Sequence, residues 1–184
     1  MLTFLNMDVE GFCSIESLHL QLNPTCTMLI KAPNGKGKST ILSALVWAIY
    51  GKNLKGVSEV NTWKQIRPKE YQGTKVQVYF QKDSHTYKVI RCQKYEGLLD
   101  DGSKGKDRLI IIKDGDTIDV KGKGKIQDVI NREIGLSYTL FMNSIMFGQG
   151  IKRLIQESNS DKKKIFEEVR SEERRVGKEC RSRW

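Results

Sequence analysis

The sequence has few cysteines, and none lies in a pattern that would give it a structural role. The four cysteines include no C-x-x-C pair, which excludes a zinc-binding pattern and a disulfide framework. Free thiols are typical of a reducing compartment, so we expect a cytoplasmic protein. The first ten residues lack the basic start and sustained apolar stretch of a secretory segment. The longest apolar stretch, residues 41–50, is too short to span a bilayer, and we expect no membrane contact.

Acidic residues are fewer than basic ones. The sequence has 22 Asp and Glu and 32 Lys and Arg, which gives a net charge of +10. This balance fits an anionic partner, either nucleotide or nucleic acid. Residues 170–184 resemble the translation of a common sequencing-adapter oligonucleotide, and we expect a read-through scar rather than native protein. They hold six basic and three acidic residues, so residues 1–169 keep a net charge of +7. The alternative is a genuine basic tail.

A loop rich in glycine and lysine, residues 32–40, lies between the apolar run 27–30 and the apolar stretch 41–50. The order of strand, glycine loop and helix is that of a P-loop NTPase. Glycines let successive backbone N–H groups turn toward an anion, and the helix N-terminus adds unpaired amides. The sequence therefore predicts a nucleotide-binding loop formed by Asn34, Gly35, Lys36, Gly37, Lys38, Ser39 and Thr40.

Two residues of this loop have predicted chemical roles. Lys38 would place its ammonium between the β- and γ-phosphates of ATP, and the Ser39 hydroxyl would complete the shell of a Mg²⁺ ion. The first position of the motif is Ala32, where glycine is usual. ATP and Mg²⁺ are thus the expected cofactors.

The remaining pattern predicts strands connected by turns, followed by helices. Alternating residues predict strands at 2–9, 17–22, 27–30, 75–80, 86–91, 108–112 and 117–120. Turns at 83–84 and 114–115 make the later strands an antiparallel meander, while the polar stretch 97–107 predicts a mobile loop. The fold class is therefore α/β with a mixed sheet, because a meander follows the first βα unit.

The C-terminal part of the sequence predicts helices at 127–134 and 137–142 and a buried strand at 143–147. Gln149 follows between two glycines, where its carboxamide can contact Mg²⁺ and orient a water for attack on the γ-phosphate. From residue 151 the composition becomes that of a charged helix, the expected start of a coiled coil. The predicted domains are a P-loop lobe at 1–150, the base of an arm at 151–169, and the non-native segment 170–184.

The order of these motifs resembles one family. The residues concerned are the N-G-x-G-K-S-T loop, the apolar helix ending at Tyr50, the V-x-V-x-F strand followed by Y-x-V-I-R, and the run from Gly135 to Gly150. Over residues 1–169 they resemble the N-terminal half of SMC-like ATPases of double-strand-break repair, the SbcC type, and phage recombination-endonuclease ATPase subunits. The resemblance implies the N-lobe of an ABC-type ATPase head leading into a coiled-coil helix.

In this family, two heads sandwich two ATP molecules, and the dimer acts on DNA ends with an SbcD-type metallophosphoesterase nuclease subunit. The resemblance implies that Lys38 and Gln149 are catalytic, that Ser39 and Gln149 contact Mg²⁺, and that the host is a bacterial or phage-infected cell. Cys13 stands where many relatives have arginine. A Walker B glutamate and a serine-glycine motif are missing, so we expect this chain alone to hydrolyse ATP poorly.

Two other functions stay open at this point. One is an SMC- or RecF-like ATPase without a nuclease partner, and the other is a non-catalytic fragment that binds nucleotide or DNA. Lysine-rich stretches at 104–106 and 121–125 could neutralise DNA phosphates, although charge runs are more often only solvated.

Overall fold

A computed structural model describes residues 2–23, 27–60, 72–120 and 123–146, with 158–160, 162–163 and 165–167. The chain divides into two compact units, Met1–Ile134 and Gly135–Trp184, and each is described by itself. Gln149 and the segment 170–184 lie outside the described residues, as does most of the predicted arm. None of the helices that the structure describes combines the length and the apolar composition needed to cross a bilayer.

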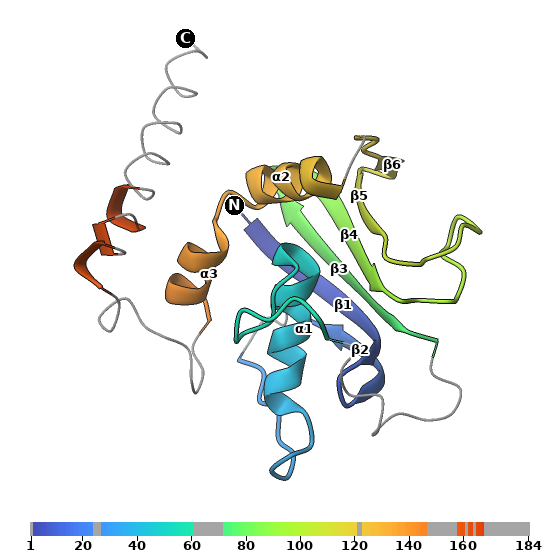
Figure 1. The fold of residues 1–184 in the computed structure, drawn as a ribbon, viewed down its shortest axis with the longest axis horizontal. Helices are drawn as coiled ribbons and strands as arrows, with labels where there is room; N and C mark the ends of the chain where they lie inside the picture. Colours follow the sequence, from blue (N-terminus) through green and yellow to red (C-terminus); the bar gives the residue numbers. More distant parts are fainter. Residues whose placement is uncertain are drawn as a thin grey trace. The chain divides into compact units, whose positions relative to one another are not determined.

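The first unit is built on a six-stranded sheet in the order β2-β1-β3-β4-β5-β6, with every neighbouring pair antiparallel (Figure 1). Its strands are β1 (Leu2–Phe12), β2 (Ile15–Gln21), β3 (Thr74–Lys82), β4 (His85–Gln93), β5 (Leu109–Lys113) and β6 (Asp116–Thr117). The predicted hairpin turn at Asp83 and Ser84 is confirmed, since both residues have a positive φ and β3 pairs with β4. Pairing in register makes alternate residues of each strand share one face of the sheet.

Two helices, α1 (Lys38–Tyr50) and α2 (Lys123–Ile134), pack against one face of this sheet (Figure 1). The helix predicted over residues 41–50 is confirmed and begins three residues earlier. Residues 44–50 of α1 are all buried. They cover a layer of fully buried apolar side chains of the sheet: Met7, Val9, Val76, Val78, Phe80, Val89 and Ile111. The helix-covered sheet with its antiparallel meander confirms the predicted α/β fold class.

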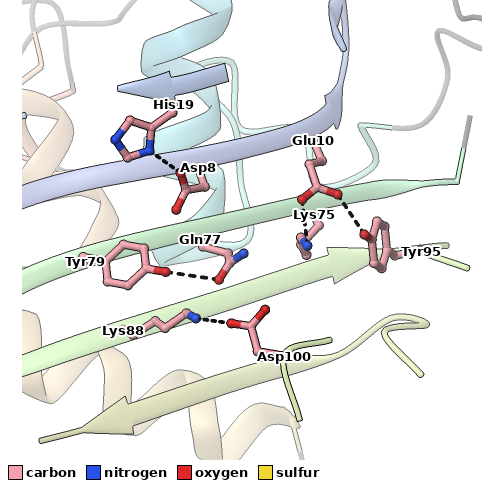
Figure 2. Close-up of polar contacts among 9 residues, drawn as sticks. All are labelled: Asp8, Glu10, His19, Lys75, Gln77, Tyr79, Lys88, Tyr95 and Asp100. Carbon is pink, nitrogen blue, oxygen red and sulfur yellow. Dashed lines mark hydrogen bonds and ion pairs between the residues drawn. The ribbon is translucent and has the colours of Figure 1, made fainter. Parts of the chain in front are cut away.

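The opposite face of the sheet carries paired charges (Figure 2). Lys75 on β3 lies 2.7 Å from a carboxylate oxygen of Glu10 on β1, and the Tyr95 hydroxyl donates to the other oxygen at 2.8 Å. Burial alone would lower the pKa of Lys75, but the hydrogen bond and charge of Glu10 outweigh it, so that pKa is raised. Lys88 on β4 pairs with Asp100 at 2.5 Å. These charges neutralise one another within the sheet face.

The connection between β4 and β5 is folded back over this charged face. The ring of Tyr95 is packed so closely that a Cβ at Gly97 or Gly105 would come within 2.7 or 2.5 Å of it. Leu99 is buried with Tyr95 against Ile90 of the sheet. The prediction of a mobile loop at 97–107 missed these contacts. The polar, glycine-rich composition of the segment gave no indication that Tyr95 and Leu99 would be buried against the sheet.

Two predicted strands are wrong, and a third, at 117–120, is shortened, because β6 covers only Asp116–Thr117. Residues 27–30 adopt no regular structure, and Leu29 is 85% exposed. A strand must pair its backbone N–H and C=O groups with a neighbour, and no described strand lies beside this segment. Residues 143–144 belong instead to helix α3 (Tyr138–Ser144) in the second unit. There the side chains of Asn143 and Ser144 donate to carbonyls four residues earlier, which suits a helix.

Candidate functional site

The phosphate loop runs directly into the N-terminus of α1. Gly37 is the N-cap residue with a φ of 83°, and Gly35 has a φ of 78°. Side chains with a Cβ rarely adopt this left-handed conformation, so both positions favour glycine. The loop closes on itself through the amides of Thr40 and Ile41, which donate to the Gly37 carbonyl at 3.0 and 3.2 Å. The helix therefore begins directly after Gly37, and the amides of Lys38 and Ser39 lie in its first turn.

The backbone N–H groups of Lys38 and Ser39 have no acceptor among the residues that the structure describes. The first turn of α1 also has no acidic side chain and no side-chain cap. Most helices satisfy such groups with a Ser, Thr, Asp or Asn cap. Here the amides and the positive end of the helix dipole stay available to an external anion. This arrangement is suited to phosphate oxygens.

The Lys38 ammonium lies across the loop. Its Nζ donates to the Ala32 carbonyl at 2.5 Å and to the Pro33 carbonyl at 2.9 Å. The side chain is therefore directed back over the loop, as the predicted role on phosphates requires. Lys38 is only partly exposed, whereas Asn34, Gly35 and Lys36 are exposed to solvent. A ligand can reach the loop from that side.

The turn between β1 and β2 supports the loop from an unexpected direction. A Cβ on Gly37 would lie 3.1 Å from the Ser14 hydroxyl oxygen, so the two segments are in close contact. Sequence analysis did not single out Ser14. No pattern in the sequence marks it; the structure shows that the preceding residue, Cys13, has a positive φ of 51° at the turn between the two strands. The neighbouring Ser14 hydroxyl is therefore a candidate polar group at the edge of the phosphate site.

The structure brings together the seven predicted nucleotide-contacting residues, because all belong to one loop and helix start. Ser39 lies in the first turn of α1 and is exposed. Gln149 lies outside the described residues, so its meeting with Ser39 at a Mg²⁺ ion stays a prediction. Lys104 and Lys106 are exposed on the folded connection, while residues 121 and 122 lie outside the described residues.

Comparisons with known proteins identify the family of this chain. Residues 6–179 match the model of the AAA domain family AAA_23. The DNA double-strand break repair Rad50 ATPase of Methanopyrus kandleri is 27% identical over 165 residues, which cover 86% of this chain and 17% of that protein. Exonuclease subunit 2 of Escherichia phage RB69 is 25% identical over 154 residues, which cover 83% of this chain and 25% of that protein. The predicted resemblance to repair ATPases and phage recombination subunits is thereby confirmed.

The chain spans a quarter or less of the length of these curated relatives. A solved structure of the recombination mediator RecF with ATP superposes with a TM-score of 0.46 at 18% identity, covering 68% of this chain and 30% of that one. The family model extends over most of the chain and includes the whole phosphate loop. This protein therefore belongs to the AAA domain family.

Proposed function

We propose that this chain is the ATP-binding N-terminal part of a DNA repair or recombination ATPase. The observation that carries the proposal is the start of α1, where the amides of Lys38 and Ser39 have no acceptor among the described residues and the Lys38 ammonium is directed back onto the loop carbonyls of Ala32 and Pro33. The amides, the helix dipole and the ammonium each favour phosphate oxygens. Similarity to a Rad50 ATPase and to a phage exonuclease subunit supports the DNA-related role.

The residues present fit a nucleotide with its Mg²⁺ ion. Lys38 would exchange the carbonyls of Ala32 and Pro33 for the β- and γ-phosphate oxygens. The exposed Ser39 hydroxyl and the Gln149 carboxamide are oxygen ligands of the kind that Mg²⁺ prefers. When bound, the ion would neutralise phosphate charge. Hydrolysis needs charge stabilisation and water positioning from more groups than these, so we expect this chain alone to hydrolyse ATP poorly.

The partners follow from the same proposal. Two heads would associate through ATP, and the dimer would act on DNA ends with an SbcD-type metallophosphoesterase nuclease subunit. The name of the phage relative, exonuclease subunit 2, supports a nuclease partner. Residues 151–169 would begin a coiled-coil arm, and residues 170–184 would be adapter-derived. The two alternative functions are an ATPase without a nuclease partner and a non-catalytic fragment that binds nucleotide or DNA. The experiments below distinguish them from the proposed function.

A nucleotide titration tests the central assignment. Lys38→Ala removes the charge-assisted bonds to phosphate, which contribute about 1.5–3 kcal/mol, so the Kd for a fluorescent ATP analogue should rise at least tenfold. Lys31→Ala is the matched control, because Lys31 is an exposed lysine just before the loop. Equal affinities for the wild type and the Lys38 variant would overturn the assignment.

A second experiment separates the DNA-related alternatives. Binding of duplex DNA ends is measured with and without the ATP analogue over a range of salt concentrations. An ATP-dependent gain supports the repair ATPase. Steep salt dependence without any nucleotide effect would instead identify a DNA-binding fragment. Co-purification with an SbcD-type nuclease subunit would support a repair ATPase that acts with a nuclease. Absence of co-purification would support an ATPase without a nuclease partner.

A further inference from the structure

The C-terminal end of α1, opposite the phosphate loop, is capped by side chains from β4 and α2. Arg91 on β4 donates from Nε to the Ala48 carbonyl at 2.9 Å and from Nη2 to the Ile49 carbonyl at 3.2 Å. Gln127 on α2 donates to the same Ile49 carbonyl at 2.8 Å. The last carbonyls of a helix lack partners within the helix, so these bonds satisfy them. Three elements of the first unit are thereby joined at one point.

The Arg91 side chain is only partly exposed and has no acidic partner among the described residues. Its guanidinium contacts the Gln127 carboxamide oxygen at 2.5 Å and lies 5.8 Å from the Trp47 ring centroid. Burial lowers the pKa of Arg91 to about 10, so the group is still protonated at neutral pH. A buried cation needs compensation, and the negative end of the α1 dipole supplies it here.

Glycine at position 51 keeps this arrangement possible. A Cβ at Gly51 would meet Nη1 of Arg91 at 3.0 Å, and the residue has a φ of 70°. Gly51 ends the helix through its amide, which donates to the Trp47 carbonyl at 2.8 Å. The helix end is therefore shaped to admit a guanidinium. Ordinary C-terminal capping would need only the glycine.

We propose that Arg91 is a positioning residue for nucleotide binding, acting through α1 on the phosphates at its other end. The inference rests on the proposed ATP site. Arg91 fixes the C-terminal end of the helix whose first turn presents the Lys38 and Ser39 amides. Its charge also replaces the negative potential of that end by a positive one. Both ends of α1 then contribute a positive potential at the phosphates, whereas without Arg91 the C-terminal end would contribute a negative one.

The expected effect depends on phosphate charge. Helix α1 has 13 residues, which at 1.5 Å per residue corresponds to about 20 Å. At about 0.01 M ionic strength, where the Debye length of about 30 Å exceeds this distance, a unit charge acting over about 20 Å at an effective dielectric constant of about 40 sets the upper limit of the loss: about 15-fold for Mg-free ATP, about 8-fold for ADP and about 4-fold for AMP. A loss of folded protein alone would weaken all three nucleotides by the same factor.

The test compares three nucleotides on the full chain with Arg91→Gln and Arg91→Lys. Glutamine keeps a hydrogen-bond donor and loses the charge, so we expect the graded loss. Lysine keeps the charge and should stay within about threefold of the wild type for every nucleotide. Arg132→Gln is the control, since the Arg132 side chain is 70% exposed on α2 and its charge is screened.

A second variant protects the test against misfolding of Arg91→Gln. Gln127→Glu would place a carboxylate on Arg91 and offset its charge, and it would also remove the amide donor to the Ile49 carbonyl. Gln127→Met removes the same donor without adding charge, so the difference between these two variants reports the charge. The same graded loss is expected in that difference. Equal factors for ATP, ADP and AMP, or unchanged ATP affinity in both charge-cancelling variants, would overturn the inference. Absence of nucleotide binding in the wild type would instead overturn the proposed function, so the two failures are distinguishable.

Discussion

Gly73, just before β3, allows the sharpest structural prediction. A Cβ at this position would lie 2.0 Å from the Lys94 carbonyl oxygen, 2.4 Å from its carbonyl carbon and 2.5 Å from the Tyr95 Cα. All three are backbone atoms, so no side-chain rotation can relieve the contact. Gly73 also has a φ of 99°, which a residue with a Cβ rarely adopts. Gly73→Ala must therefore displace one backbone segment from the other.

The cost of Gly73→Ala can be assembled from these contacts. Left-handed strain contributes about 1–2 kcal/mol. Separation of the segments breaks the bond from the Glu96 amide to the Gln72 carbonyl, at 2.6 Å, and loss of one hydrogen bond costs about 1 kcal/mol. Overpacking of the neighbouring backbone adds about 1–3 kcal/mol. We expect a total loss of about 3–6 kcal/mol in the free energy of unfolding.

Urea unfolding followed by tryptophan fluorescence measures this loss. Gly102→Ala is the matched control, because Gly102 has a φ of 75° but nothing within 4 Å of the added Cβ. The control should lose only the strain, about 1–2 kcal/mol. With an m-value of about 2 kcal/mol/M, the remaining difference of about 2–4 kcal/mol should separate the two midpoints by about 1–2 M. Agreement of the two variants within about 0.5 kcal/mol would refute the close approach of the two segments.

Two further substitutions test contacts of the first unit. Tyr87→Phe removes the bond from the buried Tyr87 hydroxyl to a Glu133 carboxylate oxygen, 2.8 Å long, and should lower the free energy of unfolding by about 1–2 kcal/mol in the same urea assay. Asp114 accepts from the Thr86 amide and pairs with His85, and these contacts hold its pKa below the ordinary 3.8. The unfolded chain therefore takes up this proton first, so the contribution of Asp114 is complete above about pH 4 and is lost as the pH falls through the folded pKa. Asp114→Asn should flatten the acid side of the stability curve, measured as urea midpoints from about pH 6 to about pH 2.5, and an unchanged slope would contradict the role of the carboxylate.

The glycine turn and helix start of the loop could be predicted from sequence because their determinants are local. Glycines with positive φ, a lysine and a helix start follow one another within a few residues, and each type has its own physical reason to be there. The buried helix after the loop and the hairpin at residues 83–84 were recognisable for the same reason. Their determinants lie within one turn or one run of alternating residues.

Predictions failed where a segment depends on distant neighbours. The apolar run 27–30 has the composition of a strand but no described partner to pair with. The apolar run 145–147 predicts the strand at 143–147, yet the polar side chains of Asn143 and Ser144 bond within a helix. The cap formed by Arg91 could not be found from sequence, because the guanidinium and its carbonyl acceptors lie more than forty residues apart.

The bonds of Lys38 to Ala32 and Pro33 affect how a ligand would arrive. The Lys38 ammonium already donates to two carbonyl oxygens. Phosphate binding would therefore replace these two bonds by bonds to phosphate oxygens and would not add bonds to an unbonded ammonium. The heat released should thus be smaller than the number of phosphate contacts suggests. Small multivalent anions should release the lysine as well, so sulfate should act as a competitor of nucleotide. The rate at which Lys38 dissociates from these two carbonyls would set an upper limit on how fast its phosphate contacts can form.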